Sequence, residues 1–133
     1  MDESILLSVQ GVTKRFGGLV ALNDVSFDVK KGEVVGLMGP NGAGKTTLLN
    51  VIAGEYVPDS GRIGFKGQDI TRMAPHKICH LGIARTYQIP QPFSEMTVEE
   101  NAMVGALFGR ASSGEKRLER AKWVRDILDQ VGL

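Results

Sequence analysis

A glycine-rich stretch lies between two segments of quite different pattern in this 133-residue sequence. Residues 39–44 read Gly-Pro-Asn-Gly-Ala-Gly, too rich in glycine for a regular helix or strand. The apolar run before it, residues 34–38, predicts a strand buried on both faces of a parallel sheet. Residues 45–53 after it predict a helix, which Gly54 would cap at its C-terminus. Strand, tight loop and helix in this order indicate an α/β fold.

With the next two residues, this stretch matches the spacing G-x-x-x-x-G-K-[ST] in full. Glycines let successive backbone N–H groups point inward around a phosphate, and the dipole of the following helix favours the same anion. Lys45 would then reach the β- and γ-phosphates, and the Thr46 hydroxyl would bind Mg²⁺, which prefers oxygen ligands. A glycine-rich connection that binds nothing is the alternative, and the strand and helix on either side argue against it. The predicted phosphate-binding residues are Gly39, Pro40, Asn41, Gly42, Ala43, Gly44, Lys45, Thr46 and Thr47.

The rest of the chain shows alternating and helical patterns around this centre. Alternating apolar residues predict strands over 5–9 and 25–29, which would form an antiparallel pair ahead of the loop. The capping-box spacing of Thr97 and Glu100 predicts a helix from there to about Phe108. The remaining predicted elements are strands over 62–65 and 83–87, a helix over 75–81, a loop over 109–114 and a last helix containing Trp123, which suits either a core or a subunit contact.

Composition excludes several classes of protein. The net charge is +1, from 16 basic and 15 acidic residues, so nucleic acid or an anionic membrane is not expected as the main partner. A single cysteine excludes an intrachain disulfide framework and fits a reducing compartment. No apolar run has the ~20 residues that span a bilayer, so a soluble, cytoplasmic chain is expected. His76, Cys79 and His80 could share a helix face and bind Zn²⁺, but without a fourth ligand nearby an ordinary surface helix is favoured.

Longer stretches of the sequence resemble the nucleotide-binding subunit of ABC transporters. The loop and its flanks match that family's Walker A wording, and Gln88 falls at the position of its Q-loop glutamine. No Asn-Lys-x-Asp motif of GTPases is present, and the antiparallel pair ahead of the loop argues against small P-loop kinases. Residues 15–19 and 82–88 are most similar to the ATPases of branched-chain amino acid importers. The resemblance covers residues 13–27, 39–48, 58–63 and 85–101.

The resemblance implies a P-loop NTPase fold and a role for further residues. Its fold would have a RecA-like core, an antiparallel β part over residues 1–32, a P-loop core to the Q-loop over 33–94 and the start of a helical subdomain over 95–133. Phe16 would stack on adenine, with a hydrophobic cap on the first strand as the alternative. Gln88 would contact Mg²⁺ or the attacking water, with a solvated loop glutamine as the alternative. Lys45 and Gln88 are the catalytic candidates, and Thr46 and Gln88 the metal ligands.

The family also needs motifs that these 133 residues do not contain. No four apolar residues precede an Asp-Glu pair, as in a Walker B strand, and no Ser-Gly-Gly-Gln-type signature or switch histidine follows. The chain is therefore expected to be the first half of an ABC ATPase domain, with little or no turnover alone. In the whole protein, it would bind ATP and Mg²⁺, pair with a second identical or related ATPase subunit, and energise transmembrane permease subunits from the inner face of the plasma membrane. The alternative is a non-catalytic nucleotide-binding or interaction module.

Overall fold

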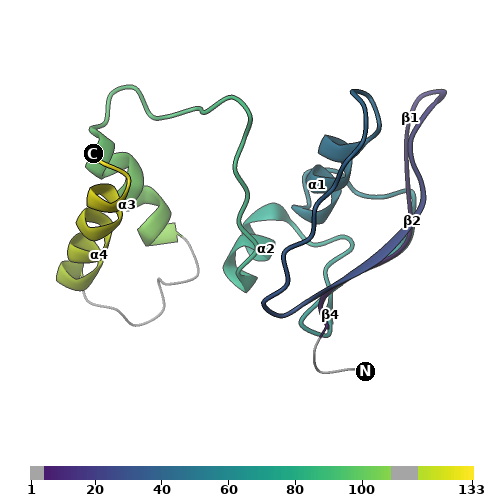
Figure 1. Ribbon diagram of the computed structural model, residues 1–133, viewed down its shortest axis with the longest axis horizontal. Helices are drawn as coiled ribbons and strands as arrows, with labels where there is room; N and C mark the ends of the chain where they lie inside the picture. Colours follow the sequence, from purple (N-terminus) through teal and green to yellow (C-terminus); the bar gives the residue numbers. More distant parts are fainter. Residues whose placement is uncertain (1–4, 109–116) are drawn as a thin grey trace. The chain divides into compact units, whose positions relative to one another are not determined.

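The structure, a computed structural model, describes residues 5–108 and 117–133. These residues form four strands and four helices, which confirms an α/β fold (Figure 1). The chain divides into two compact units, the first ending at Ile78 and the second starting at Cys79. The first unit contains the sheet and the glycine-rich loop, and the second contains the last two helices.

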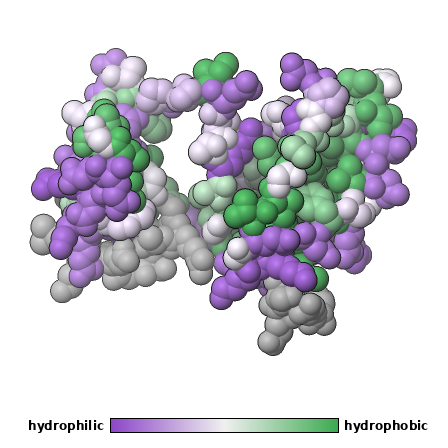
Figure 2. Space-filling model, viewed as in Figure 1, coloured by the Kyte–Doolittle hydropathy of each residue, from purple (hydrophilic) through white to green (hydrophobic). Residues whose placement is uncertain are grey.

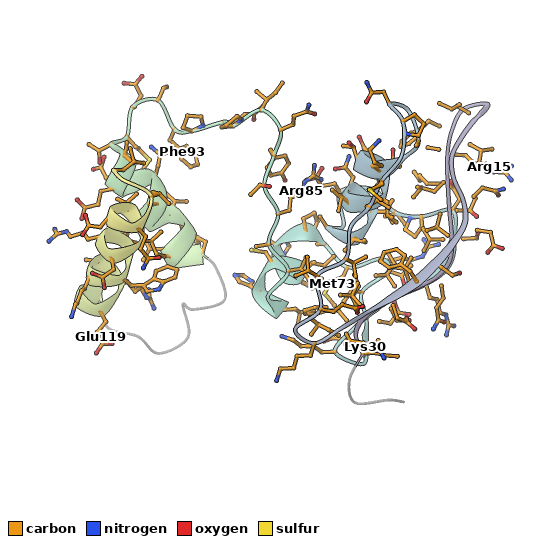
Figure 3. The ribbon with its side chains drawn as sticks, viewed as in Figure 1. Arg15, Lys30, Met73, Arg85, Phe93 and Glu119 are labelled. Carbon is orange, nitrogen blue, oxygen red and sulfur yellow. The ribbon has the colours of Figure 1, made fainter. Side chains whose placement is uncertain are left out.

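Strands β1 (Ile5–Phe16) and β2 (Leu19–Lys30) form the predicted antiparallel pair. They are joined by a tight turn at Gly17, where φ is 57°, and Phe16 pairs with Leu19 beside it. Both strands are longer than the alternating runs that predicted them. Figure 3 labels Arg15 near the turn and Lys30 at the end of β2, which mark the two ends of this hairpin.

The sheet continues on the other side of β1. Strand β3 (Ser60–Phe65) pairs antiparallel with β1, and β4 (Gln68–Asp69) pairs with β3, so the order is β2-β1-β3-β4. The strand predicted over 62–65 is confirmed as part of β3. Strand β4 was not predicted, because its two-residue turn, Lys66 and Gly67 with φ of 51° and 78°, begins with lysine rather than the usual asparagine or aspartate.

Helix α1 (Lys45–Ile52) confirms the helix predicted after the glycine-rich loop. Its apolar face buries Leu48 and Val51. The first unit's core also includes Val9, Val12, Leu22, Ile63, Phe65, Ile70 and Ile78. Helix α2 (Pro75–Leu81) has its predicted bounds and contributes Ile78 to this core.

Two predicted strands are wrong. Neither residues 34–38 nor residues 83–87 form a strand, and both lie outside the four-stranded sheet of the described residues. An apolar run becomes a strand only where a neighbouring strand accepts its backbone hydrogen bonds, and the sequence pattern does not supply that neighbour. Val34 is 96% exposed and Met38 is 92% exposed, so the run is not buried either. Figure 2 shows hydrophobic residues reaching the surface of the first unit.

The second unit contains helices α3 (Val98–Phe108) and α4 (Arg117–Gln130). Ala106 and Val124 are buried, and the Arg125 Nε donates to the Glu99 carboxylate across the two helices at 2.9 Å. Trp123 is half-exposed, so it does not belong to a core. The loop predicted over 109–114 lies outside the described residues.

The capping box predicted for α3 is confirmed. The Thr97 N–H donates to the Glu100 carboxylate at 2.7 Å, and the Glu100 N–H donates to Thr97 Oγ1 at 3.2 Å. The pKa of Glu100 lies below its usual value, because hydrogen bonds to its carboxylate from the backbone and from the side chain of Thr97 stabilise the charged form. Within residues 5–108 and 117–133, no helix combines the length and apolar character that a bilayer crossing needs.

Candidate functional site

The glycine-rich loop leads directly into the N-terminus of α1. Gly44 is the N-cap, and the first helical bond runs from the Leu48 N–H to the Gly44 carbonyl at 2.9 Å. The N–H groups of residues 45–47 therefore have no partner within the helix, as at any helix start. Donor groups and the positive end of the helix dipole face the same loop, which is the arrangement that binds phosphate.

Gly44 cannot be another residue without moving the loop. Its φ is 84°, and a Cβ there would lie 2.3 Å from the Ala21 carbonyl oxygen. This close approach packs the end of the loop against β2. Ala21 is two residues along β2 from Leu19, which pairs with Phe16, so loop and aromatic residue share the turn end of the hairpin.

Lys45 folds back over the loop. Its ammonium group donates to the carbonyl oxygens of Gly39 and Pro40, at 2.6 Å each. The structure thus brings the predicted lysine and the predicted loop together and places a positive charge at the loop itself. A phosphate group would offer the ammonium stronger, charged acceptors than these carbonyls.

The residues around Lys45 fit Mg²⁺ and a polyphosphate in their chemistry. Thr46 is exposed at the start of α1, and its hydroxyl is a hard oxygen donor of the kind that Mg²⁺ takes together with phosphate oxygens. Thr47 follows and is half-buried. In the part of the chain that the structure describes, no group of three or more His, Cys, Asp or Glu side chains could hold a metal ion.

Phe16 presents an aromatic ring at the end of β1 and is 42% exposed. The Tyr56 ring meets it edge to face, with centroids 5.2 Å apart and an angle of 75° between the planes. The ammonium of Lys14 lies 5.4 Å from the Phe16 centroid. The ring is thus partly held by neighbours and partly open to a ligand.

Gln88 belongs to a different unit of the chain from the other predicted site residues. It belongs to the second unit, on an exposed segment without helix or strand, whereas Lys45 and Phe16 belong to the first unit. Its predicted contact with Mg²⁺ or water stays a prediction.

Three residues that hold segments near the predicted site residues in sequence or in contact, one in the second unit and two in the first, were not singled out from the sequence. Asn101 on α3 ties down the segment after Gln88: its Nδ2 donates to the carbonyl oxygens of Phe93, Met96 and Thr97 at 3.1, 3.1 and 2.9 Å, and its Oδ1 accepts from the Phe93 N–H at 2.8 Å. Asparagine readily bonds nearby backbone groups, so its place just inside the predicted helix was the available clue. Asp59 and Tyr56, which contact β1 from 40 or more residues away, offered no such local clue.

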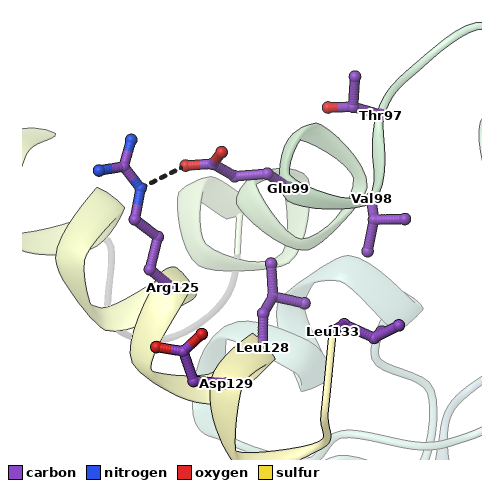
Figure 4. A pocket seen from close by; sticks show the side chains of 7 residues that line it. All are labelled: Thr97, Val98, Glu99, Arg125, Leu128, Asp129 and Leu133. Carbon is purple, nitrogen blue, oxygen red and sulfur yellow. Dashed lines mark hydrogen bonds and ion pairs between the residues drawn. The ribbon is translucent and has the colours of Figure 1, made fainter.

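The second unit also has a groove between α3 and α4 (Figure 4). Its volume is about 580 Å³, and the ion pair of Glu99 and Arg125 crosses one side. Leu128 and Leu133 give it an apolar wall, and the complete lining is Thr97, Val98, Glu99, Arg125, Leu128, Asp129 and Leu133.

Comparison with known proteins shows which family this chain resembles. The family model described as ABC transporter matches residues 22–133. A probable branched-chain amino acid transport ATP-binding protein LivG of Archaeoglobus fulgidus is 50% identical over 99 residues, which are 74% of this chain and 38% of that protein. The chain therefore spans about two fifths of the length of this curated relative.

Two solved structures share the fold. An ATP-binding cassette of an ABC transporter in its ADP conformation, MJ1267, is 43% identical with a TM-score of 0.70 and matches 90% of this chain and 45% of its own. The dimeric structure of MJ0796, a bacterial ABC transporter cassette, is 25% identical with a TM-score of 0.83, covering 96% and 58%.

Proposed function

Since the chain belongs to the ABC transporter ATP-binding family and has that family's P-loop NTPase fold, we propose that it binds Mg·ATP through residues 39–47. The observation that carries this proposal is the loop itself. The loop ends at Gly44, the N-cap of α1, and the Lys45 ammonium donates to two carbonyl oxygens of the loop. Lys45 would exchange these carbonyls for the β- and γ-phosphates, and Thr46 would bind Mg²⁺.

Two further residues complete the proposed site. Phe16 would stack on the adenine base, which its exposure and its place at the loop end of the hairpin support. Gln88 would contact Mg²⁺ or the attacking water, and it would do so from the Q-loop at the end of the 33–94 core. The antiparallel part over 1–32 and the helical start over 95–133 would flank that core. When bound, Mg²⁺ would neutralise charge on the phosphates.

The whole protein would hydrolyse ATP and energise a transporter. We propose import of branched-chain amino acids, because the relative that is 50% identical has a name that states this transport. A second ATPase subunit would face this one, as the dimeric cassette with a TM-score of 0.83 supports. Permease subunits would dock on the segment around Gln88 and on α3 and α4, whose groove offers apolar and charged groups. The chain would then lie on the inner face of the plasma membrane.

Thermal unfolding with and without saturating Mg·ATP tests the binding proposal. A ligand at a hundred times its dissociation constant stabilises by about 2.7 kcal/mol, which corresponds to a shift of about 10 °C near this size. Lys45→Ala should lose this shift, whereas Lys31→Ala, in the exposed turn after β2, should keep it. An equal shift in both variants would reject the assigned role of Lys45.

Phosphate release measures the second part of the proposal. If the 133-residue chain released phosphate from ATP and Lys45→Ala abolished this, the chain would be an ATPase without further segments. Binding without release would leave hydrolysis to the whole protein, as we propose. Absence of both binding and release would contradict the function.

A further inference from the structure

We propose that Tyr56 is a positioning residue for nucleotide binding, whose ring holds the Phe16 ring in the orientation that accepts the base. This inference rests on the proposed function, since it requires that Phe16 contacts adenine. It goes beyond that function because it adds a residue outside the loop and gives it a task distinct from phosphate binding.

The first argument is the geometry of the two rings. Their centroids are 5.2 Å apart and their planes are inclined by 75°, so the positive edge of one ring meets the negative face of the other. Both rings are partly exposed, Phe16 at 42% and Tyr56 at 38%, so neither is enclosed in a core. Without its partner, the Phe16 side chain would have more rotamers open to it, and binding would have to order it.

The second argument is that Tyr56 itself is held in place by α1. The helix ends in a Schellman motif, in which the Gly54 N–H donates to the Val51 carbonyl at 3.1 Å and the Glu55 N–H to the Asn50 carbonyl at 2.9 Å. Gly54 is required there, because its φ is 79° and a Cβ would lie 2.8 Å from the Met73 carbonyl oxygen. The Tyr56 N–H also donates to the Asn50 carbonyl, at 3.3 Å.

The third argument is that the segment after Tyr56 is bonded to β1 close to Phe16. Asp59 donates its N–H to the Thr13 carbonyl at 2.9 Å, and its carboxylate accepts from the Arg15 N–H at 2.6 Å. The Lys14 ammonium donates to the Val57 carbonyl at 2.8 Å and lies near the Phe16 ring. Tyr56 is therefore fixed on both sides, by the end of α1 and by β1.

Together these contacts join the base site to the phosphate site through one helix. The phosphate loop ends at Gly44, the N-cap of α1, and Tyr56 follows two residues after Gly54 at the other end of the helix. The eight residues of α1 span about 12 Å. A shift of α1 would thus move both Lys45 and the neighbour of Phe16. Tyr56 should affect the base contact while leaving the phosphate contacts of the loop unchanged.

The test compares two ligands by calorimetric titration of the 133-residue chain. Mg·ATP reports base and phosphate contacts, and Mg·tripolyphosphate reports phosphate contacts alone. Tyr56→Leu, which removes the ring but keeps an apolar side chain, should weaken ATP binding by about 2- to 12-fold, the range expected for loss of one edge-to-face pair. Tripolyphosphate binding should stay within twofold.

Two variants separate positioning from general destabilisation. Tyr56→Phe keeps the ring and should bind ATP as the unmodified chain does. Val57→Ala shortens the neighbouring exposed side chain and keeps the carbonyl that Lys14 contacts, so it should change neither affinity. Unchanged ATP binding in Tyr56→Leu, an equal loss for both ligands, or a Tyr56→Phe variant as weak as Tyr56→Leu would each overturn the inference.

The unmodified chain distinguishes this inference from the function beneath it. If it bound tripolyphosphate as tightly as ATP, the phosphate loop would stand, and the base contact of Phe16 and the task of Tyr56 would both be rejected. If it bound neither ligand, the proposed function would fail and the inference with it.

Discussion

Among single residues, Gly44 is under the strongest steric constraint at the candidate site. A side chain there must adopt a φ of 84° and place its Cβ 2.3 Å from the Ala21 carbonyl oxygen. The left-handed conformation alone costs about 1–2 kcal/mol. Relief of the overlap adds about 1–3 kcal/mol, as in overpacked cores, because the Ala21 carbonyl belongs to the backbone of β2 and cannot rotate away.

We therefore expect Gly44→Ala to lower the free energy of unfolding by more than Gly32→Ala does. Gly32 is the matched control, since its φ is 80° and nothing lies within 4 Å of an added Cβ. Urea unfolding measures both variants, and Gly44→Ala should in addition lose the stabilisation by Mg·ATP. Equal losses of stability in the two variants would show that the contact with Ala21 has no energetic weight.

The residues of the site were predictable from the sequence only where their chemistry is local. Residues 39–46 lie within one turn and one helix start, so their spacing alone indicates a phosphate loop. Tyr56 and Asp59 depend instead on contacts with Phe16 and Arg15, which are 40 and 44 residues earlier in the chain. Such contacts arise from the pairing of β1 with β3, and no local pattern records which side chains that pairing brings together.

At the level of elements, the capping box of α3 makes a prediction about pH. Hydrogen bonds to the Glu100 carboxylate from the Thr97 backbone N–H and from the Thr97 side chain lower the pKa of Glu100, so the charged form is favoured in the folded state. Its contribution to stability is present above the ordinary Glu pKa of about 4.3 and is lost as the pH falls through the lower folded value. An NMR titration should give Glu100 a midpoint below about 4.3, with the Thr97 amide shift following it.

Two variants identify the source of this titration. Glu100→Gln should abolish the pH dependence of the Thr97 amide shift below pH 5, since no carboxylate is left to protonate. Glu95→Gln removes a charge from the same segment but not from the capping box, so it should leave that dependence in place. A Glu100 midpoint at or above the ordinary value would contradict the cap.

Elements were predictable from the sequence in the same uneven way. The hairpin of β1 and β2 and the helices α1 and α3 carry their own turn, cap and periodicity, and each is confirmed. The strands predicted over 34–38 and 83–87 are wrong, because an apolar run specifies a preference for burial but not the neighbour that would accept its hydrogen bonds. Strand β4 was not predicted, because its two residues, Gln68 and Asp69, are polar and form a strand only by pairing with β3.

At the scale of the whole molecule, residues 34–38 give the first unit an exposed apolar band. Val34 and Met38 are 96% and 92% exposed, and Val35 and Leu37 are about half-exposed. Contiguous apolar surface of this kind promotes association between copies. The 133-residue chain should therefore associate as its concentration rises, which light scattering across a concentration series would detect.

Replacing both Val34 and Met38 with lysine should weaken this association and leave folding nearly unchanged. Both side chains are almost fully in water, and surface substitutions of this kind usually change stability by within about 0.5 kcal/mol. Val51→Lys is the destabilising control. Val51 is 2% exposed on the buried face of α1, so a charge there should unfold the first unit. If the double variant instead unfolded like Val51→Lys, residues 34–38 would be buried in solution, as their apolar sequence alone would indicate, and the exposed band would not exist.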